Sequence, residues 1–260
     1  MKGRGCRCLP MSPETFELRP GALLVADAHY SARRPELLSF LKAVASGEIA
    51  ATQLILMGDI FDLLFGGIPM TLERNAEAVG TINAIAERME VIYLEGNHDF
   101  QLAAYFPKLR VYPLSSQPVA CRFEGHEVML AHGDWGTDLG YRLYTSVIRS
   151  KTVLALLKVI DILTGHSIIR WLDRYLEEKE DCNEFVGFDV YVRRRLERLD
   201  LEKTDWFIEG HYHQNRGVEG ASCRYFNLAA FACNQRYFEL QSATDQGPRL
   251  HEAMFGKESR

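Results

Sequence analysis

Five short apolar runs in this sequence each end in a cluster of Asp, Asn and His residues. The run Leu54-Ile55-Leu56-Met57, for example, leads directly into Gly58-Asp59. Wholly apolar runs of this length are typical of strands that are buried on both faces of a sheet. The five clusters are Asp27-Ala28-His29, Gly58-Asp59, Gly96-Asn97-His98-Asp99, His132-Gly133-Asp134 and Gly210-His211-Tyr212-His213. Because loops at the carboxyl ends of parallel strands share one crevice, we expect these side chains to meet there.

The order of the predicted elements indicates an α/β fold. We expect strands at residues 22–26, 54–57, 91–94, 119–123, 127–131, 206–208, 224–228 and 236–240. Helices at 35–46 and 72–89 separate the first three strands, which predicts a parallel sheet with right-handed crossovers. The expected organisation is a flexible segment at 1–20, one domain at 21–241 with a helical insertion at about 137–203, and a polar tail at 242–260.

Composition narrows the class of protein. The 260 residues are 47% hydrophobic and 25% charged, and the net charge of −5 argues against general nucleic-acid binding. No run approaches the roughly 20 apolar residues needed to cross a bilayer, and no secretion signal is evident. The six cysteines form no Cys-x-x-Cys pair, so we expect reduced thiols and a cytoplasmic location.

The pooled side chains of the five clusters suit divalent metal ions. They offer imidazole nitrogens, carboxylates and one amide oxygen without a thiolate, which favours Mn, Fe or Zn over Ca or Mg. Any one cluster alone could be an ordinary turn or helix cap. Five in this order, each after an apolar strand, predict a centre in which seven ligands hold two ions that share a carboxylate.

The series of clusters resembles that of the calcineurin-like metallophosphoesterase superfamily, over about residues 23–240. This resemblance implies two β-sheets packed as a sandwich, flanked by helices, around two divalent ions, with Mn expected first and Fe or Zn as alternatives. One ion would be held by Asp27, His29, Asp59 and His213, and the other by Asp59, Asn97, His132 and His211.

Two such ions imply a hydrolytic reaction at phosphorus. Cations about 4 Å apart can deprotonate a bridging water near neutral pH and neutralise charge on a phosphate. We therefore expect phosphoester or pyrophosphate hydrolysis. In this scheme His98 carries no metal and stabilises a phosphoryl oxygen or protonates the leaving group, while Asp99 orients His98.

The residues after His132-Gly133-Asp134 indicate the substrate. Thr137, Asp138 and Tyr141, followed by the helical insertion, are similar to the pattern of bacterial UDP-2,3-diacylglucosamine pyrophosphatases. This resemblance implies cleavage of a lipid A precursor into UMP and 2,3-diacylglucosamine 1-phosphate, beneath a helical lid that houses the acyl chains. The chain departs from that family at His98, where an Arg is usual, and at residues 65–69, where an acidic loop is usual.

Composition of the insertion agrees with a lipid substrate. Between residues 153 and 163 only Ala155, Lys158 and Asp161 are not large aliphatics, and residues 141–174 hold six basic against two acidic side chains. Apolar helices with a basic margin suit an anionic lipid or contact with the inner-membrane surface, although a hairpin packed on itself fits equally. The expected substrate-binding residues are Arg142, Arg149, Leu156 and Leu157.

Two other functions stay open at this point. One is a phosphodiesterase or phosphatase for a soluble nucleotide or a phosphoprotein, and the other is a non-catalytic binding module on the same scaffold. A degenerate module should have lost ligands, whereas all seven expected ligands and His98 are present. We expect a nucleotide-linked lipid or other phosphate compound as the partner, with neither a nucleic acid nor an obligate protein partner.

Overall fold

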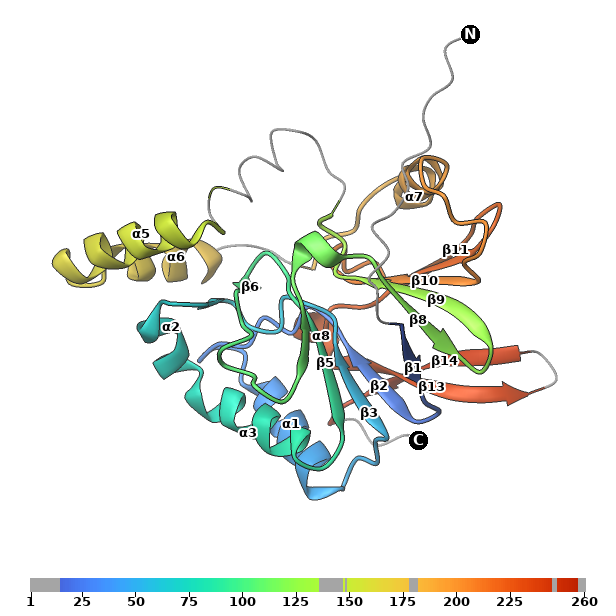
Figure 1. Cartoon of the computed structure of the whole chain (residues 1–260), viewed down its shortest axis with the longest axis horizontal. Helices are drawn as coiled ribbons and strands as arrows, with labels where there is room; N and C mark the ends of the chain where they lie inside the picture. Colours follow the sequence, from blue (N-terminus) through green and yellow to red (C-terminus); the bar gives the residue numbers. More distant parts are fainter. Residues whose placement is uncertain (1–14, 136–146, 148, 178–181, 245–246, 257–260) are drawn as a thin grey trace, which may run out of the picture.

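Two six-stranded sheets pack face to face at the centre of the chain (Figure 1). The computed structural model describes residues 15–135, 147, 149–177, 182–244 and 247–256. The first sheet has the order β14 (Gly247–Met254), β13 (Arg236–Thr244), β2 (Ala22–Val25), β3 (Gln53–Leu56), β5 (Glu90–Leu94), β7 (Arg110–Tyr112). The second has the order β1 (Phe16–Leu18), β8 (Val119–Phe123), β9 (His126–Ala131), β10 (Trp206–Glu209), β12 (Arg224–Asn227), β11 (Arg216–Glu219). A small parallel pair, β4 (Leu64–Phe65) and β6 (Asp99–Phe100), lies beside them.

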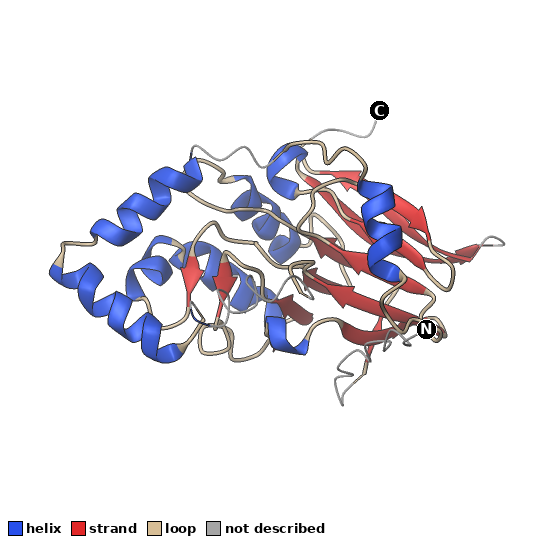
Figure 2. Ribbon diagram, turned by 90° about the horizontal axis from the view of Figure 1, so that it is seen from above, coloured by secondary structure: helices blue, strands red, loops and turns tan. Residues whose placement is uncertain are grey.

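Helices cover the outer face of each sheet (Figures 1 and 2). Helices α1 (Glu36–Ser46) and α3 (Ala76–Ala86) pack on the first sheet, and α7 (Phe188–Leu196) packs on the second. The other helical elements among the described residues are α2 (Pro69–Arg74), the 3₁₀ turn η1 (Leu114–Ser116), α5 (Lys151–Leu163), α6 (Ser167–Glu177) and α8 (Phe231–Asn234). The expected two-sheet α/β sandwich is therefore confirmed.

Burial on both faces explains why the central strands are wholly apolar. Leu23 and Val25 pack under α1 and α3, whereas Leu24 and Ile55 point into the space between the two sheets. Each strand thus contributes alternate residues to two cores. The same alternation gives the second sheet its contact with α7 on its other face.

Both chain ends contribute more structure than the sequence suggested. β1 pairs in parallel with β8, and Phe16 and Leu18 are buried where a flexible segment was expected. β14 runs antiparallel to β13 across residues where a loose polar tail was expected. Those two expectations are wrong for residues 16–18, 242–244 and 247–254. The polar sequence of residues 247–254 does not indicate a strand because β14 is an edge strand, and an edge strand can carry polar residues that would be costly in a central one.

A disulfide joins Cys182, just before α7, to Cys233 in α8, with a Cα–Cα distance of 5.8 Å. The expectation of reduced thiols is wrong for this pair, which is 51 residues apart in sequence and shows no spacing signal. Cys121 and Cys223 are buried thiols. Cys6 and Cys8 lie outside the described residues.

Within its described residues the insertion contains α5, α6 and α7. Helices α5 and α6 form a hairpin that projects from one end of the molecule (Figure 1). Asp161 fixes the hairpin, because its Oδ1 accepts the backbone N–H groups of Ile168 and Ile169 at 3.0 and 3.1 Å. Among the described residues no single helix is long and apolar enough to cross a membrane, and α5 and α6 reach that length only as a pair bent by 102°.

A buried ion pair attaches the insertion to the second sheet. The guanidinium of Arg195 in α7 bonds to the carboxylate of Glu209 and donates to the carbonyl oxygen of Gly133 at 3.1 Å. Glu209 also accepts hydrogen bonds from Trp135 Nε1 at 2.6 Å and the Tyr225 hydroxyl at 2.9 Å. Because Glu209 is fully buried, its charge depends on these partners.

Replacing Arg195 tests this attachment. Arg195→Gln leaves the Glu209 carboxylate buried without its counter-charge, and we expect the free energy of unfolding to fall by on the order of 3–5 kcal/mol. Arg194→Gln is the matched control, because Arg194 is exposed on the same helix. Urea unfolding followed by circular dichroism measures both. Equal stability of the two variants would contradict the role assigned to the pair.

Candidate metal centre

The five clusters meet at one end of the sandwich. Strands β2, β3 and β5 are parallel neighbours, as are β9 and β10, so their carboxyl ends open at a common edge. Three groups of side chains there have potential ligand atoms within 4.8 Å of one another. They are Asp27, His29 and His213; Asp59, His132 and His211; and His29, Asp62 and His98. The first two groups contain six of the seven expected metal ligands.

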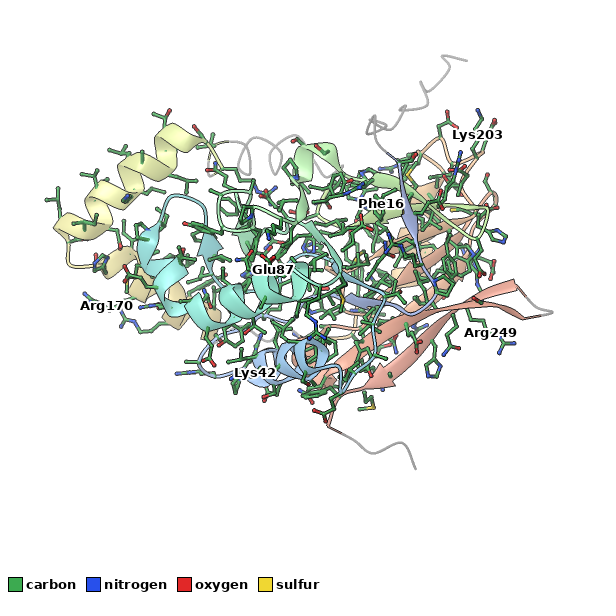
Figure 3. The ribbon with its side chains drawn as sticks, turned by 60° about the horizontal axis from the view of Figure 1, so that its bottom comes forward. Phe16, Lys42, Glu87, Arg170, Lys203 and Arg249 are labelled. Carbon is green, nitrogen blue, oxygen red and sulfur yellow. A yellow bond between two sulfur atoms is a disulfide. The ribbon has the colours of Figure 1, made fainter. Side chains whose placement is uncertain are left out.

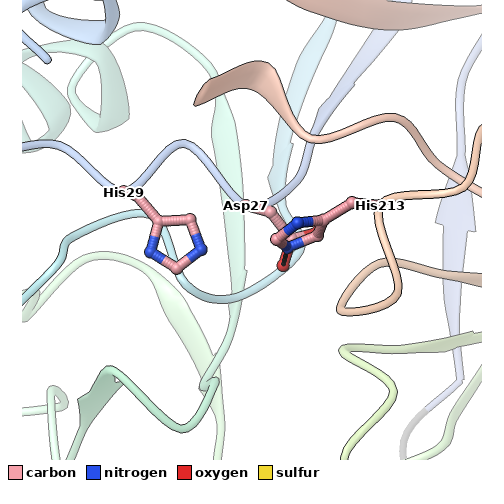
Figure 4. A group of neighbouring side chains, drawn as sticks. All are labelled: Asp27, His29 and His213. Atoms are coloured by element: carbon pink, nitrogen blue, oxygen red, sulfur yellow. Dashed lines mark ion pairs between the residues drawn. The ribbon is translucent and has the colours of Figure 1, made fainter. Parts of the chain in front are cut away.

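The first group surrounds Asp27 (Figure 4). Figure 4 shows His29 beside Asp27 and the ring of His213 against the Asp27 carboxylate. The Nε2 atom of His213 is 3.2 Å from Asp27 Oδ1, and the backbone N–H of His211 donates to Asp27 Oδ2 at 2.9 Å. The Nε2 atom of His29 is buried and has no hydrogen-bond partner in the described part of the chain. A buried imidazole nitrogen without a partner fits a metal ligand.

The second group surrounds Asp59. The Nε2 atom of His132 is 3.3 Å from Asp59 Oδ2 and 3.4 Å from Asn97 Oδ1. The rings of His132 and His211 are 5.0 Å apart. The structure therefore brings Asn97, the seventh expected ligand, to this group.

Hydrogen bonds on the far side of two rings orient them toward the centre. His132 Nδ1 donates to the carbonyl oxygen of Met57 at 3.0 Å, and His29 Nδ1 bonds to Asp62 Oδ1 at 3.1 Å. With each Nδ1 engaged, Nε2 is the atom that faces the centre and that a metal ion would bind in place of a proton, as in many metal sites. Sequence reasoning assigned no role to Asp62, since nothing local pairs it with a histidine 33 positions earlier.

Electrostatics at the centre favour positive charge. Burial alone would raise the pKa of Asp59, but the nearby His132 and His98 hold it well below its usual range. Burial opposes ionisation of His132 as well, yet Asp59 raises the pKa of His132 well above its ordinary value. Burial and the charge of His132 lower the pKa of His211 to about 3, so His211 is a neutral imidazole. Carboxylates and a neutral imidazole are the forms that bind metal ions.

The backbone carries strain at these same residues. Five non-glycine residues here adopt left-handed backbone conformations, with φ of 51° at Asp27, 45° at His29, 50° at Asp59, 65° at His211 and 60° at His213. Each such residue costs on the order of 1–3 kcal/mol and persists only where its surroundings fix it. Five of the seven expected ligands share the feature, which is typical of a functional site.

Two glycines allow the ligands to approach closely. A Cβ atom on Gly96 would lie 2.2 Å from Asp59 Oδ1, and one on Gly58 would lie 2.5 Å from His132 Nδ1. Gly58 also has φ of +87°, which other residues adopt only with strain. These contacts explain the Gly in Gly58-Asp59 and in Gly96-Asn97-His98-Asp99.

Asp99 has a different role from the one expected. Its carboxylate accepts backbone N–H groups from residues on both neighbouring loops and the hydroxyl of Tyr93. The backbone donors are Asp59, Ile60, Phe61 and Gly96. Burial and the charge of Asp59 raise the pKa of Asp99 to about 7. The ring of His98 is instead held through Nδ1, 3.0 Å from the carbonyl oxygen of Asp62. Asp99 therefore positions the Asp59 loop.

An apolar cavity of about 480 Å³ opens beside the second group, between the α5–α6 hairpin and the β4–β6 pair. Asn97, His98, Arg149 and Leu157 line it. Arg149 Nη2 donates to the carbonyl oxygen of Gly96 at 2.7 Å and lies 3.3 Å from Asp134 Oδ2.

The four expected substrate-binding residues are placed differently by the structure. Arg149 and Leu157 line the apolar cavity. Leu156 is 60% exposed and is not among the residues that line the cavity, so the structure does not bring it together with the other two. Successive side chains on a helix point about 100° apart, and a run in which nearly every residue is apolar does not show which of them faces the cavity. Arg142 lies outside the described residues.

Comparison with known proteins identifies the family. Residues 22–215 match the model of the calcineurin-like phosphoesterases. The chain belongs to this family. It is a metal-dependent phosphoesterase.

The chain is 29% identical over 198 residues to the UDP-2,3-diacylglucosamine hydrolase of Ectopseudomonas mendocina and 23% identical over 197 residues to that of Escherichia coli O7:K1. Each match covers 74% of this chain and 81% of the relative. The crystal structure of a dimetal phosphatase from Danio rerio matches 90% of this chain and 98% of its own with a TM-score of 0.44 and 13% identity.

A methyl group at residue 96 should disrupt the centre. Gly96→Ala places Cβ against Asp59 and displaces its carboxylate, so we expect hydrolysis to fall by on the order of 10²-fold. Gly80→Ala is the control, because a Cβ there meets nothing within 4 Å and should stabilise α3 by about 0.5–1 kcal/mol. Metal titration and a phosphodiester assay check both variants. Normal metal affinity in Gly96→Ala would refute the close-approach argument.

Removing the Asp62 carboxylate should weaken one metal site. Asp62→Ala frees the His29 ring to rotate, and we expect a 10- to 100-fold loss of affinity for one of the two expected ions, the usual effect of losing such a partner. Titration of metal-free protein with Mn²⁺ measures this directly. Asp200→Ala, at an exposed position, should bind Mn²⁺ as the unchanged protein does. An unaltered titration curve for Asp62→Ala would show that Asp62 does not orient His29.

Proposed function

We propose that this phosphoesterase hydrolyses UDP-2,3-diacylglucosamine to UMP and 2,3-diacylglucosamine 1-phosphate, a step of lipid A biosynthesis. The observation that carries the proposal is the apolar cavity, which begins at Asn97 and His98 and continues beneath the α5–α6 hairpin. The names of the relatives from Ectopseudomonas mendocina and Escherichia coli support the same substrate.

The donor set suits two divalent ions, with Mn as our first choice and Fe or Zn as alternatives. Asp27, His29 and His213 would hold one ion, and Asn97, His132 and His211 the other, with Asp59 shared between them. Such ions, when bound, supply a water activated for attack and neutralise charge on the phosphate.

His98 is the residue that we assign to the leaving group or a phosphoryl oxygen. Its ring is fixed through Nδ1 by the carbonyl oxygen of Asp62, and it lies between His29 and the apolar cavity. From there its other ring nitrogen would donate a hydrogen bond or a proton to the substrate. Arg149, at the same cavity wall, adds positive charge where a phosphate would enter.

The lining of the cavity suits acyl chains. Apart from Asn97, His98, Arg149 and Asp161, its residues are aliphatic or aromatic: Leu63, Phe65, Ile68, Phe100, Leu154, Leu157, Ile168, Ile169, Trp171, Leu172, Tyr175 and Leu176. Burying a methylene group contributes roughly 0.8 kcal/mol, so even a short acyl segment there would raise affinity by orders of magnitude.

The outer face of the hairpin suits a membrane surface. Leu163 is 80% exposed, and Leu156, Val159 and Ile162 are exposed on the same helix. Arg170, labelled at the outer end of the molecule in Figure 3, and Arg174 are exposed on α6. Exposed aliphatics beside basic residues favour contact with an anionic bilayer, where an acylated substrate resides.

The direct test is release of UMP. The Mn²⁺-loaded protein is incubated with UDP-2,3-diacylglucosamine in detergent micelles, and UMP is measured with and without EDTA. We expect UMP release that EDTA abolishes and added Mn²⁺ restores. Hydrolysis of soluble phosphodiesters without any release from the lipid substrate would favour the alternative of a soluble nucleotide or phosphoprotein substrate, to which His98 in place of Arg also points.

Leu156 and Leu157 are adjacent in the sequence, but Leu157 lines the apolar cavity whereas Leu156 is exposed on the outer face of the hairpin. Leu157→Ser should raise the KM for UDP-2,3-diacylglucosamine about tenfold, because it puts a hydroxyl among the acyl chains. Leu156→Ser should leave that KM in micelles within about twofold but weaken binding to anionic vesicles. Circular dichroism confirms that each variant folds. Identical effects of the two substitutions on both readouts would contradict the assignment of two faces.

A further inference from the structure

A second cavity, of about 550 Å³, lies beside the same centre and has a different lining. It is formed by the loop after His29, by α2 and by α6. Its polar and aromatic lining residues include Tyr30, Arg33, Arg34, Asp62, Arg74 and Asp173. Its volume is within the roughly 300–1,000 Å³ of small-molecule sites.

The two cavities adjoin beside the metal centre. His29, Asp62 and His98 have ligand atoms within 4.8 Å of one another, and Asp62 lines the polar cavity while His98 lines the apolar one. Leu63 and Leu176 border both cavities. A substrate whose reacting phosphate lies at this group would therefore extend one part into each cavity.

The polar cavity has the chemistry of an anion site. Three arginines stand against two carboxylates, so the lining carries a net positive charge. Arg34 Nη1 is 4.0 Å from Asp62 Oδ1, and Arg74 forms an ion pair with Asp173. A guanidinium group matches the geometry of phosphate oxygens, and two arginines from different elements could hold one phosphate from two sides.

An aromatic ring stands in the same cavity. Tyr30 is partly buried, and its ring packs edge-on against Phe61 with centroids 5.8 Å apart. A ring held in this way offers a planar surface on which a nucleobase can stack. The cavity thus combines basic, acidic and aromatic side chains, a combination that can bind a phosphorylated nucleoside but offers little to an acyl chain.

We propose that the polar cavity binds the nucleoside monophosphate part of the substrate, with Arg33 and Arg74 at its phosphate and Tyr30 at its base. This inference rests on the proposed function, because it divides that substrate between the two cavities. The acylated sugar phosphate occupies the apolar cavity, and the bond to be cleaved lies between them at His29, Asp62 and His98.

The probe for this site is UMP. It is tested as an inhibitor of bis(4-nitrophenyl) phosphate hydrolysis by the Mn²⁺-loaded protein, beside inorganic phosphate and uridine, and its binding to metal-free protein is measured by calorimetry. Arg33→Gln and Arg74→Gln should each raise the inhibition constant of UMP about tenfold, as for loss of one charge-assisted hydrogen bond. The constant for inorganic phosphate should change less than about twofold, and calorimetry should show the same loss of UMP affinity.

Arg122→Gln is the control, because Arg122 pairs with Glu127 on the exposed side of the β8–β9 hairpin. Arg33 is exposed, so Arg33→Gln should fold normally. An unchanged UMP constant in the Arg33→Gln, Arg74→Gln double variant would overturn the proposal. A parallel rise in the phosphate constant would do the same, since it would show that the arginines act on any bound phosphate and do not select the nucleotide.

The outcomes separate this inference from the proposed function. If UMP inhibition depends on the two arginines but no UMP is released from UDP-2,3-diacylglucosamine, the nucleotide site stands and the lipid substrate is wrong. If the lipid substrate is hydrolysed and the arginine variants bind UMP normally, the nucleotide site is wrong and the proposed function stands.

Discussion

The buried carboxylate of Asp99 holds together the two loops on which the centre is built. Four of its five hydrogen bonds join the backbone after β3 to the backbone after β5, the fifth comes from the Tyr93 hydroxyl, and Asp59 between them has a left-handed conformation. Asp59 in turn lies against His132 and accepts the backbone N–H of His98 at 2.8 Å. A strained backbone is stable only where several contacts fix it at once. Asp99 provides those contacts from a fully buried position.

The helical insertion is attached to this centre at two places. Near the start of α5, Arg149 donates to the carbonyl oxygen of Gly96 and pairs with Asp134. In α7, Arg195 reaches the carbonyl oxygen of Gly133 and the carboxylate of Glu209, one residue before Gly210-His211. Arg149, which lines the apolar cavity, and Arg195 are thus each connected by hydrogen bonds to the loops that carry the proposed ligands. A change in one is expected to alter the other.

The central strands and their polar clusters could be predicted because each is a local pattern in the chain. An apolar run of four or five residues identifies a strand that is covered on both faces, and parallel order places the ends together. The partners across the site could not be predicted. Asp62 bonds to His29, which is 33 residues earlier in the sequence, and Asp99 bonds to backbone N–H groups, which every residue type except proline has. The face of α5 on which Leu156 or Leu157 lies, and the Cys182–Cys233 bond, likewise depend on tertiary packing.

The residues of the centre that have left-handed backbone conformations lower the stability of the fold but supply the side chains that the chemistry needs. Glycine adopts that backbone conformation without a steric penalty, so it would relieve strain at Asp27, His29, Asp59, His211 or His213. The same change would delete a ligand. Selection of random variants for heat resistance alone would therefore enrich substitutions that dismantle the centre, and only selection that also demands turnover would keep the native side chains. Substitutions that relieve backbone strain, a usual way to stabilise an enzyme, are therefore not available at these five positions.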